Sequence, residues 1–149
     1  MTASAGKPMT HEDQIRAIIF DWSDAVRAKD AARLVANLAP DARVFDLITP
    51  LQYVGAQTVR QRVEQWLSSF TGPLAYDVHQ LRIAAGDDVA FCHSINSIKG
   101  QTKDGKAIDM AWRATVCFER ISGQWYATHE HSSVPFDMTT GQASLDLKP

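Results

Sequence analysis

"GQWYATHEHSSVPF" (Gly123–Phe136) closes a run of four predicted strands, and this run decides the fold. The strand inside it is predicted over residues 124–134, after strands over 74–84, 87–99 and 107–121. The connecting segments "AGDD", "KGQTKDGK" and "ERISGQ" contain the Gly and Asp residues that are typical of hairpin turns. The second half of the chain is therefore predicted to form an antiparallel sheet.

The first half of the chain has helical periodicity instead. A helix is predicted from Thr10, because Thr10 and Asp13 have the spacing of a capping box. Its apolar stripe consists of Ile15, Ile18, Ile19, Trp22, Ala25 and Val26. Two further helices are predicted over residues 30–38 and 56–70, separated by a short strand over 42–48. Helices followed by strands predict an α+β domain with the helices on one face of the sheet.

Length and composition are those of a single folded domain. The chain has 149 residues, of which 45% are hydrophobic and 21% are charged, as is typical of a globular protein with one core. Residues 1–9 are predicted to be a flexible tail, residues 10–137 the domain, and residues 138–149 a second tail. The formal net charge of −2 and the lack of a long Lys/Arg run argue against a nucleic-acid partner.

Cellular location is predicted from segments that the sequence lacks. Residues 1–9 have no apolar core of the kind found in signal peptides. No apolar run approaches the roughly 20 residues of a membrane span. Cys92 and Cys117 both lie in strand-like runs and are expected to be free thiols. We therefore expect a cytoplasmic protein with no membrane partner.

Alternation along the predicted strands groups the polar side chains by face. On the last strand, His129, His131 and Ser133 share a face with Trp125, and this face is expected to turn from the core into a pocket. Glu130 is expected to point away from both histidines.

The two preceding strands carry further candidates. Arg113 and Thr115 belong to a polar face that could line a cavity. On the strand over 87–99, His93 shares a face with apolar residues, and Ser94 and Asn96 lie on the other face. His93 is therefore either a core histidine satisfied by one hydrogen bond or a pocket residue.

Two segments carry a family resemblance. "APDARVFDLITPLQYVG" and the closing "GQWYATHEHSSVPFD" resemble the NTF2-like superfamily, in its SnoaL-like and ketosteroid-isomerase-like branch, over roughly residues 10–137. The resemblance implies a cone: a strongly curved antiparallel sheet with three helices closing its concave face around an apolar pocket. It also implies a homodimer formed through the sheet.

The same resemblance assigns roles to individual positions. In the ketosteroid isomerases an aspartate base lies in a segment that "VFDLITPLQYVG" matches, which places the base at Asp46. The tyrosine that donates to the oxyanion in those enzymes aligns with Trp22. Their second donor, a protonated aspartic acid, falls near Ala114 or Thr115, where no acid is present. Steroid isomerisation itself is therefore not expected.

The leading hypothesis is proton transfer on a small, largely apolar ligand. Asp46 would act as the base, while His129 and His131 would polarise a carbonyl or move the proton. Arg113 would hold negative charge. Trp22, Tyr53, His93, Asn96, Thr115 and Ser133 would complete the substrate-binding wall.

Two other hypotheses remain open. The same cavity could belong to a binding module without chemistry, because a fold does not decide a function. A metal site at His129 and His131 would need further ligands, and only His93, His79 and Asp46 are candidates. The sequence contains no glycine-rich phosphate loop, so no organic cofactor is expected, and no metal is assigned.

Overall fold

The structure is a computed structural model that describes residues 7–149. The flexible tail predicted for residues 1–9 falls mostly outside the described residues. Residues 7–10 belong to neither a helix nor a strand. Among the described residues, none of the helices is both long and apolar enough to cross a membrane.

A single six-stranded sheet forms one layer, in the order β2-β1-β6-β5-β4-β3. The strands are β1 (Leu38–Phe45), β2 (Tyr53–Val54), β3 (Phe70–Ala85), β4 (Val89–Thr102), β5 (Ala107–Ile121) and β6 (Gln124–Ser133). Strands β3 to β6 pair as antiparallel hairpins, as predicted. The sheet is mixed, however, because β1 runs parallel to β6.

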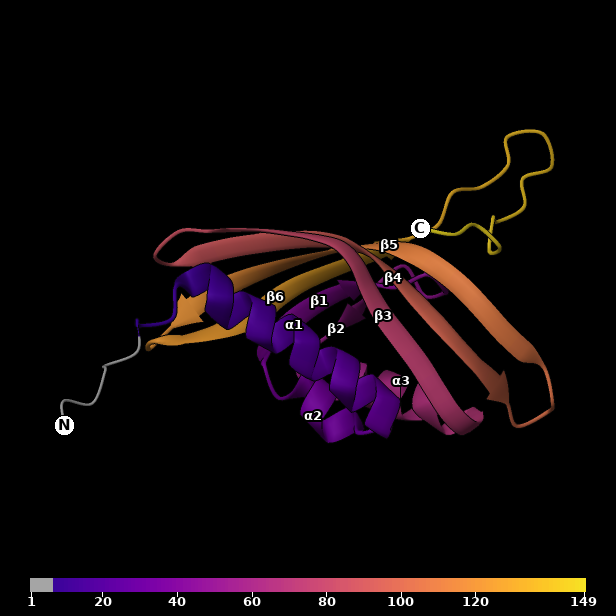
Figure 1. Cartoon of the computed structure of the whole chain (residues 1–149), viewed down its shortest axis with the longest axis horizontal. Coiled ribbons are helices and arrows are strands. Elements are labelled where there is room, and N and C mark those ends of the chain that lie inside the picture. The colour runs from indigo at the N-terminus through magenta and orange to yellow at the C-terminus, as the bar shows by residue number, and fades with distance from the viewer. Residues whose placement is uncertain (1–6) are drawn as a thin grey trace.

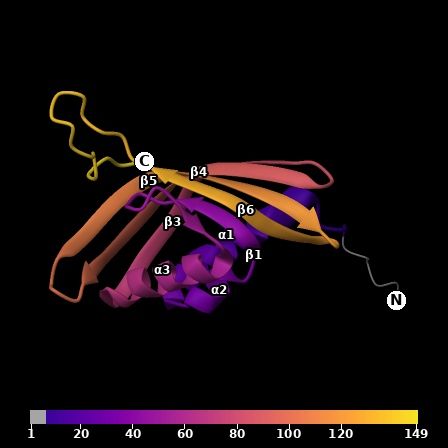
Figure 2. The ribbon, with the colours of Figure 1, turned by 180° about the vertical axis from the view of Figure 1, so that it is seen from behind.

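Three helices lie against the concave side of this curved sheet: α1 (His11–Ala28), α2 (Ala31–Val35) and α3 (Ala56–Ser68). The sheet arches over them in Figure 1, and Figure 2 shows the same arrangement from behind. The predicted α+β architecture, with a curved sheet and three helices on one face, is confirmed. The predicted capping box is also present, with Thr10 and Asp13 bonded to each other's backbone N–H groups.

Strand β1 begins earlier than predicted. Leu38 was assigned to a helix, but α2 ends at Val35 and β1 starts at Leu38. Leu38 and Ala39 are buried, and Leu38 pairs with Ala127 of β6. Tertiary pairing thus overrides the local helical pattern, because burying these side chains against β6 contributes more than one further helical turn.

A β-bulge in β6 sets which side chains face the helices. Phe118 of β5 pairs with Ala127, whereas the adjacent Cys117 pairs with His129. Thr128 is therefore an extra residue in β6, and the alternation shifts by one position there. Trp125 and Ala127 are buried on the concave side, but His129 falls on the convex side.

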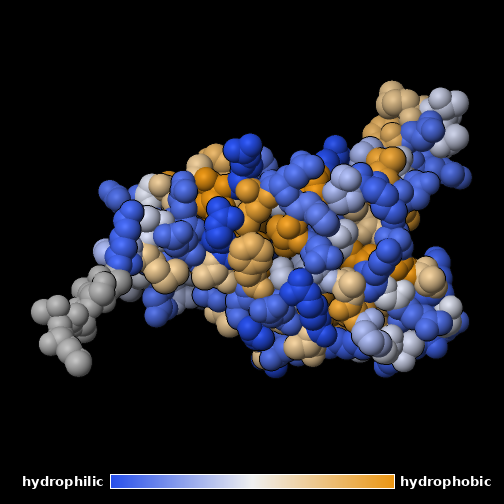
Figure 3. Space-filling model, in the orientation of Figure 1, coloured by the Kyte–Doolittle hydropathy of each residue, from blue (hydrophilic) through white to orange (hydrophobic). Residues whose placement is uncertain are grey.

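The segment after β6 contains no helix or strand and extends from the end of the sheet, as the yellow trace in Figure 1 shows. A single bridge joins Phe136 to Ala143. The Lys148 ammonium returns to the sheet and lies 2.6 Å from a carboxylate oxygen of Asp109 on β5. Figure 3 shows hydrophobic residues exposed among the hydrophilic ones on this face of the molecule.

Candidate functional site

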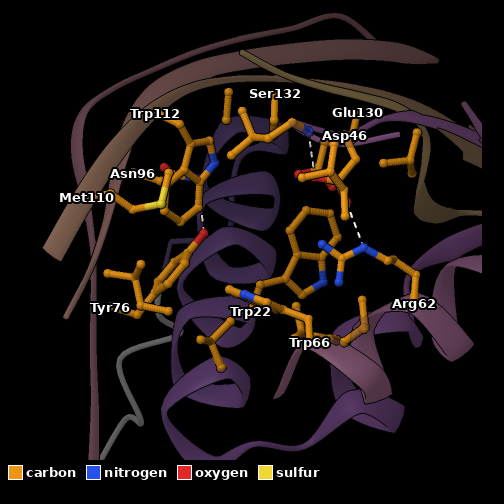
Figure 4. A pocket seen from close by; sticks show the side chains of 18 of the residues that line it. Trp22, Asp46, Arg62, Trp66, Tyr76, Asn96, Met110, Trp112, Glu130 and Ser132 are labelled. Atoms are coloured by element: carbon orange, nitrogen blue, oxygen red, sulfur yellow. Dashed lines mark hydrogen bonds and ion pairs between the residues drawn. The ribbon is translucent and has the colours of Figure 1, made fainter. Parts of the chain in front are cut away.

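A cavity of about 580 Å³ lies between the concave face of the sheet and the helices. This volume falls within the range of small-molecule sites. Much of the lining is aromatic or aliphatic, and Figure 4 shows several of these side chains. They include Trp22, Trp66, Phe70, Ile98, Met110 and Trp112. The few polar side chains therefore stand out against an apolar wall.

An ion pair occupies one end of the cavity, where β1 ends. The guanidinium Nε of Arg62 on α3 donates to Oδ2 of Asp46 at 3.0 Å. The second carboxylate oxygen of Asp46 accepts from the Leu47 backbone N–H at 2.6 Å. Only about a fifth of each side chain is exposed, 20% for Arg62 and 22% for Asp46. Both oxygens of Asp46 are therefore engaged by charge-assisted hydrogen bonds in a partly dry site.

Glu130 of β6 lines the same end of the cavity, as Figure 4 shows. Burial, together with the negative charge of Asp46, raises the pKa of Glu130 to about 7. The Ser132 hydroxyl acts in the opposite direction by favouring the charged form. A carboxyl group with a pKa near 7 is present in both protonation states at neutral pH, so it can accept and return a proton.

A chain of polar side chains crosses the other part of the concave wall. Ser94 donates its hydroxyl hydrogen to Oδ1 of Asn96 at 2.8 Å, and Nδ2 of Asn96 donates to the Tyr76 hydroxyl at 3.0 Å. Ser94 and Asn96 lie on β4 and Tyr76 lies on β3, and all three line the cavity. Burial holds the pKa of Tyr76 well above its usual range, so this phenol remains protonated.

Trp22 forms part of the cavity wall and does not fill the space. Its ring stacks on Phe118, with centroids 6.1 Å apart and planes 22° from parallel. The indole Nε1 is buried and has no hydrogen-bond partner among residues 7–149. This position therefore contributes an aromatic surface in the present arrangement.

The structure brings some of the predicted site residues together and separates the others. Trp22, Asp46, Tyr53 and Asn96 line the cavity. The remaining candidates lie on the convex face of the sheet: His93, Arg113, Thr115, His129, His131 and Ser133.

The predicted orientation of β6 is wrong. Glu130 was expected to point outward and His129 and His131 inward, but the bulge at Thr128 reverses the faces, and Ser133 lies outward with the histidines. Strict alternation counted forward from Trp125 cannot show that one inserted residue exchanges the two faces of the strand.

The expected cavity faces of β4 and β5 also need correction. Met110, Trp112, Ala114 and Val116 of β5 line the cavity, whereas Arg113 and Thr115 lie on the other face. His93 lies outward as well, because Asn96 and Ser94 occupy the inward positions of β4. The apolar face of β5 turns inward because the helices cover that side of the sheet. The prediction that the polar face of this strand lines the cavity is therefore wrong.

The convex face collects the histidines without forming a chelate. His129 Nδ1 lies 2.8 Å from the Arg43 carbonyl oxygen. The imidazoles of His129 and His131 contact Phe45 edge to face, and their own centroids are 6.4 Å apart. Arg113 donates to the Ser133 hydroxyl at 3.1 Å. Among residues 7–149, no three His, Cys, Asp or Glu side chains cluster as metal ligands would.

Sequence reasoning missed Arg62, Tyr76, Ser94, Glu130 and Ser132 as cavity residues. Arg62 gave one usable signal, since it stands one residue before Val63 on the predicted apolar side of α3. Glu130 gave none, because its inward position depends on the bulge.

Comparisons with known proteins agree with this architecture. A family profile described as the SnoaL-like domain matches residues 15–137. The solved structure of an NTF2-like protein of unknown function from Pseudomonas putida KT2440 is 38% identical, with a TM-score of 0.84. The alignment covers 93% of this chain and 96% of that chain. No curated protein sequence matches the chain.

More distant structures share the fold. A candidate aromatic ring hydroxylase from Novosphingobium aromaticivorans is 20% identical, with a TM-score of 0.74 and coverage of 85% of this chain and 90% of that one. A candidate dehydratase of the NTF2-like family from Streptomyces avermitilis is 14% identical, with a TM-score of 0.70 and coverage of 81% and 93%. Similarity at these identities extends to the fold alone.

Proposed function

This chain belongs to the SnoaL-like domain family, and from that premise we propose that it binds a small, largely apolar molecule and moves a proton on it. The cavity supports the binding part of the proposal, since its wall is mostly apolar and its volume of about 580 Å³ suits a molecule of a few rings. The reaction class would be isomerisation, dehydration or cyclisation without an organic cofactor.

The observation that carries the proposal is the position of Glu130 in the wall of this mostly apolar cavity, at the same end as Asp46. A base works best when its pKa lies near the working pH, and Glu130 has a pKa of about 7. In the proposed step, its carboxylate takes a proton from a carbon next to a carbonyl group. The electron pair of the C–H bond moves into an enolate, and the new carboxylic acid then returns a proton to the same or another carbon.

Asp46 is the base suggested by the family resemblance, but in this proposal it has an electrostatic role. Its two oxygens are occupied by Arg62 and the Leu47 N–H, so it is the less available proton acceptor. Its charge instead helps to keep Glu130 protonated until the working pH is reached. Asp46 as the base itself is the competing assignment within the same site.

Deuterium exchange tests the proposal without knowledge of the natural substrate. The probe is 2-tetralone, a bicyclic aromatic ketone with acidic C–H bonds next to its carbonyl, dissolved in D2O with the protein. We expect exchange above the rate in buffer alone. Glu130→Gln should lose about a hundredfold or more of that catalysis.

A matched control separates this effect from a general change in charge. Glu119→Gln removes an exposed carboxylate from β5 and should leave exchange unchanged. Wild-type exchange no faster than in buffer, or full exchange in Glu130→Gln, would contradict the proposed role. Tight binding of 2-tetralone without exchange would favour the alternative function, a ligand-binding module.

We also propose that a second copy of the chain covers the convex face of the sheet. This face exposes Val89, Phe91 and Phe45, with exposed fractions of 63%, 50% and 37%. Two-fold dimers are the commonest protein assemblies, and a sheet face that packs on its own copy would bury these side chains.

A further inference from the structure

Arg62 is the one basic side chain in the cavity lining that residues 7–149 form. This lining also contains two acidic side chains, Asp46 and Glu130, and its other members are uncharged. Arg62 extends from α3, and Figure 4 shows its guanidinium group beside Asp46. A cation among apolar side chains is costly unless it is paired, so the partners of its N–H donors indicate what the cavity can bind.

The guanidinium group of Arg62 is only partly engaged. Its Nε donates to Asp46 at 3.0 Å, whereas the terminal nitrogens Nη1 and Nη2 have no hydrogen-bond partner within the described part of the chain. Arg33 differs, because it holds Asp21 with both Nε and Nη2. Arg62 therefore keeps one edge of its guanidinium group, with two adjacent nitrogens, free for another acceptor.

The terminal nitrogens of Arg62 are also accessible. Among the described residues, the buried side-chain nitrogens without a partner belong to His11, Trp22 and Arg120. The nitrogens of Arg62 lack a partner but are not among these buried atoms, and the side chain is 20% exposed. Figure 4 shows the guanidinium group directed toward Trp22, on the cavity side. A bound molecule can therefore reach the free edge.

We propose that Arg62 binds a carboxylate group of the ligand through its two terminal nitrogens, so that the natural ligand is a carboxylic acid with a largely apolar body. This assignment rests on the binding part of the proposed function, and it adds the charge of the molecule. Asp46 would be a positioning residue, because it holds the guanidinium group through Nε.

The shape of the free edge favours a carboxylate. Two parallel N–H donors match the two oxygens of a carboxylate in one plane, and such charge-assisted hydrogen bonds are stronger than neutral ones. A dianion such as a phosphate ester fits less well, because Asp46 already pairs with Arg62 and the described lining has no second cation. The apolar side chains of the lining, including Trp66 and Phe70, would contact the rest of the molecule.

The protonation state of Glu130 sets the charge at this end of the cavity. The pKa of Glu130 is about 7, so at pH 6 this side chain is mostly neutral and does not repel an incoming carboxylate. Asp46 and Arg62 then compensate each other. Binding measurements at pH 6 therefore test the free edge of Arg62 with little interference from Glu130.

Two ligands of nearly the same shape, 2-naphthoate and 2-naphthamide, test the proposal at pH 6. Only the first is charged there, because carboxylic acids titrate near pH ~4. We expect the wild type to bind the carboxylate at least about tenfold more tightly than the amide. Arg62→Met should lose this preference. Arg62→Lys, which keeps the charge but not the paired nitrogens, should retain only part of it.

Arg60→Met is the matched control. Arg60 lies on the same helix and pairs with Glu64 through its Nε at 2.8 Å, outside the cavity lining, so both affinities should stay unchanged. Asp46→Asn removes the negative charge that competes for Arg62, and it should increase the preference for 2-naphthoate by roughly threefold or more.

Three results would overturn the proposal. The first is a wild type that binds both ligands equally or binds neither. The second is an equal loss of affinity for both ligands in Arg62→Met. The third is a preference for 2-naphthoate that does not rise in Asp46→Asn.

These results separate the carboxylate subsite from the proposed proton transfer. A preference for 2-naphthoate that depends on Arg62, without exchange of 2-tetralone, would reject the transfer and retain the subsite. Exchange that depends on Glu130, without a preference for 2-naphthoate, would retain the transfer and reject the subsite.

Discussion

Asp46 and Glu130 bring two carboxyl groups to the same end of one cavity from neighbouring strands. Val44 of β1 pairs with Glu130 of β6, and Asp46 follows two residues after Val44. Arg62 neutralises Asp46, whereas Glu130 has no cationic partner among the described residues. The two carboxyl groups are therefore distinguished by environment: Asp46 is paired with a guanidinium, whereas Glu130 has no such partner and has a raised pKa.

The first prediction concerns stability as a function of pH. The raised pKa of Glu130 means that the folded state retains a proton that the unfolded state releases between pH 4.5 and about 7. The free energy of unfolding therefore falls through this window and levels off above it. Glu130→Gln removes the partly buried charge, so above pH 7 it should be more stable than the wild type by up to about 3 kcal/mol.

Chemical denaturation at pH 4.5 and at pH 8 checks this prediction. The difference between variant and wild type should be small at the lower pH and large at the higher one. Glu119→Gln, which lies in solvent, should show no such change. A variant that is less stable than the wild type at pH 8 would be inconsistent with a buried carboxyl of raised pKa.

The second prediction concerns the coupling between the two acids. The charge of Asp46 raises the pKa of Glu130, and Asp46→Asn removes that charge while keeping the shape. The pKa of Glu130 should then fall, and the pH midpoint of 2-tetralone exchange should move to a lower value. The pH–rate profile measures this shift. An exchange rate that is abolished at every pH would instead support Asp46 as the base.

The third prediction concerns the convex face. The side chain of Phe91 is 50% exposed in the single chain, and Phe91→Glu places a charge on this apolar surface. If a second copy covers this face, the variant should shift from dimer to monomer in analytical ultracentrifugation. Met138→Glu makes the same change at an exposed position in the C-terminal segment and should leave the dimer intact. A monomeric wild type would remove the proposed interface.

The sequence predicted most of the fold because its signals are local. The capping box of α1, the hairpin turns and the periodicity of β3 to β6 depend on residues close in the chain. Leu38 shows the limit, since its place in β1 depends on a pairing with Ala127 about ninety residues later. The parallel pairing of β1 with β6 has the same long-range origin.

The candidate site was predicted only in part, and the reason is geometric. Asp46, Trp22, Tyr53 and Asn96 line the cavity as expected. His129 and His131 do not, because one inserted residue at Thr128 reverses the faces of β6 beyond it. A bulge cannot be recognised from a single sequence. For the same reason, the inward position of Glu130, the proposed base, was not predicted.

The titration of Glu130 tests the central claim most directly. The measurement is the chemical shift of its side-chain carboxyl carbon by 13C NMR from pH 3 to pH 10, assigned by comparison with Glu130→Gln. We predict a midpoint near pH 7, as expected for a partly buried carboxyl group close to the charge of Asp46. A midpoint near 4.5, the value of an unperturbed glutamate in water, would contradict the account, since Glu130 would then be a permanent anion at neutral pH.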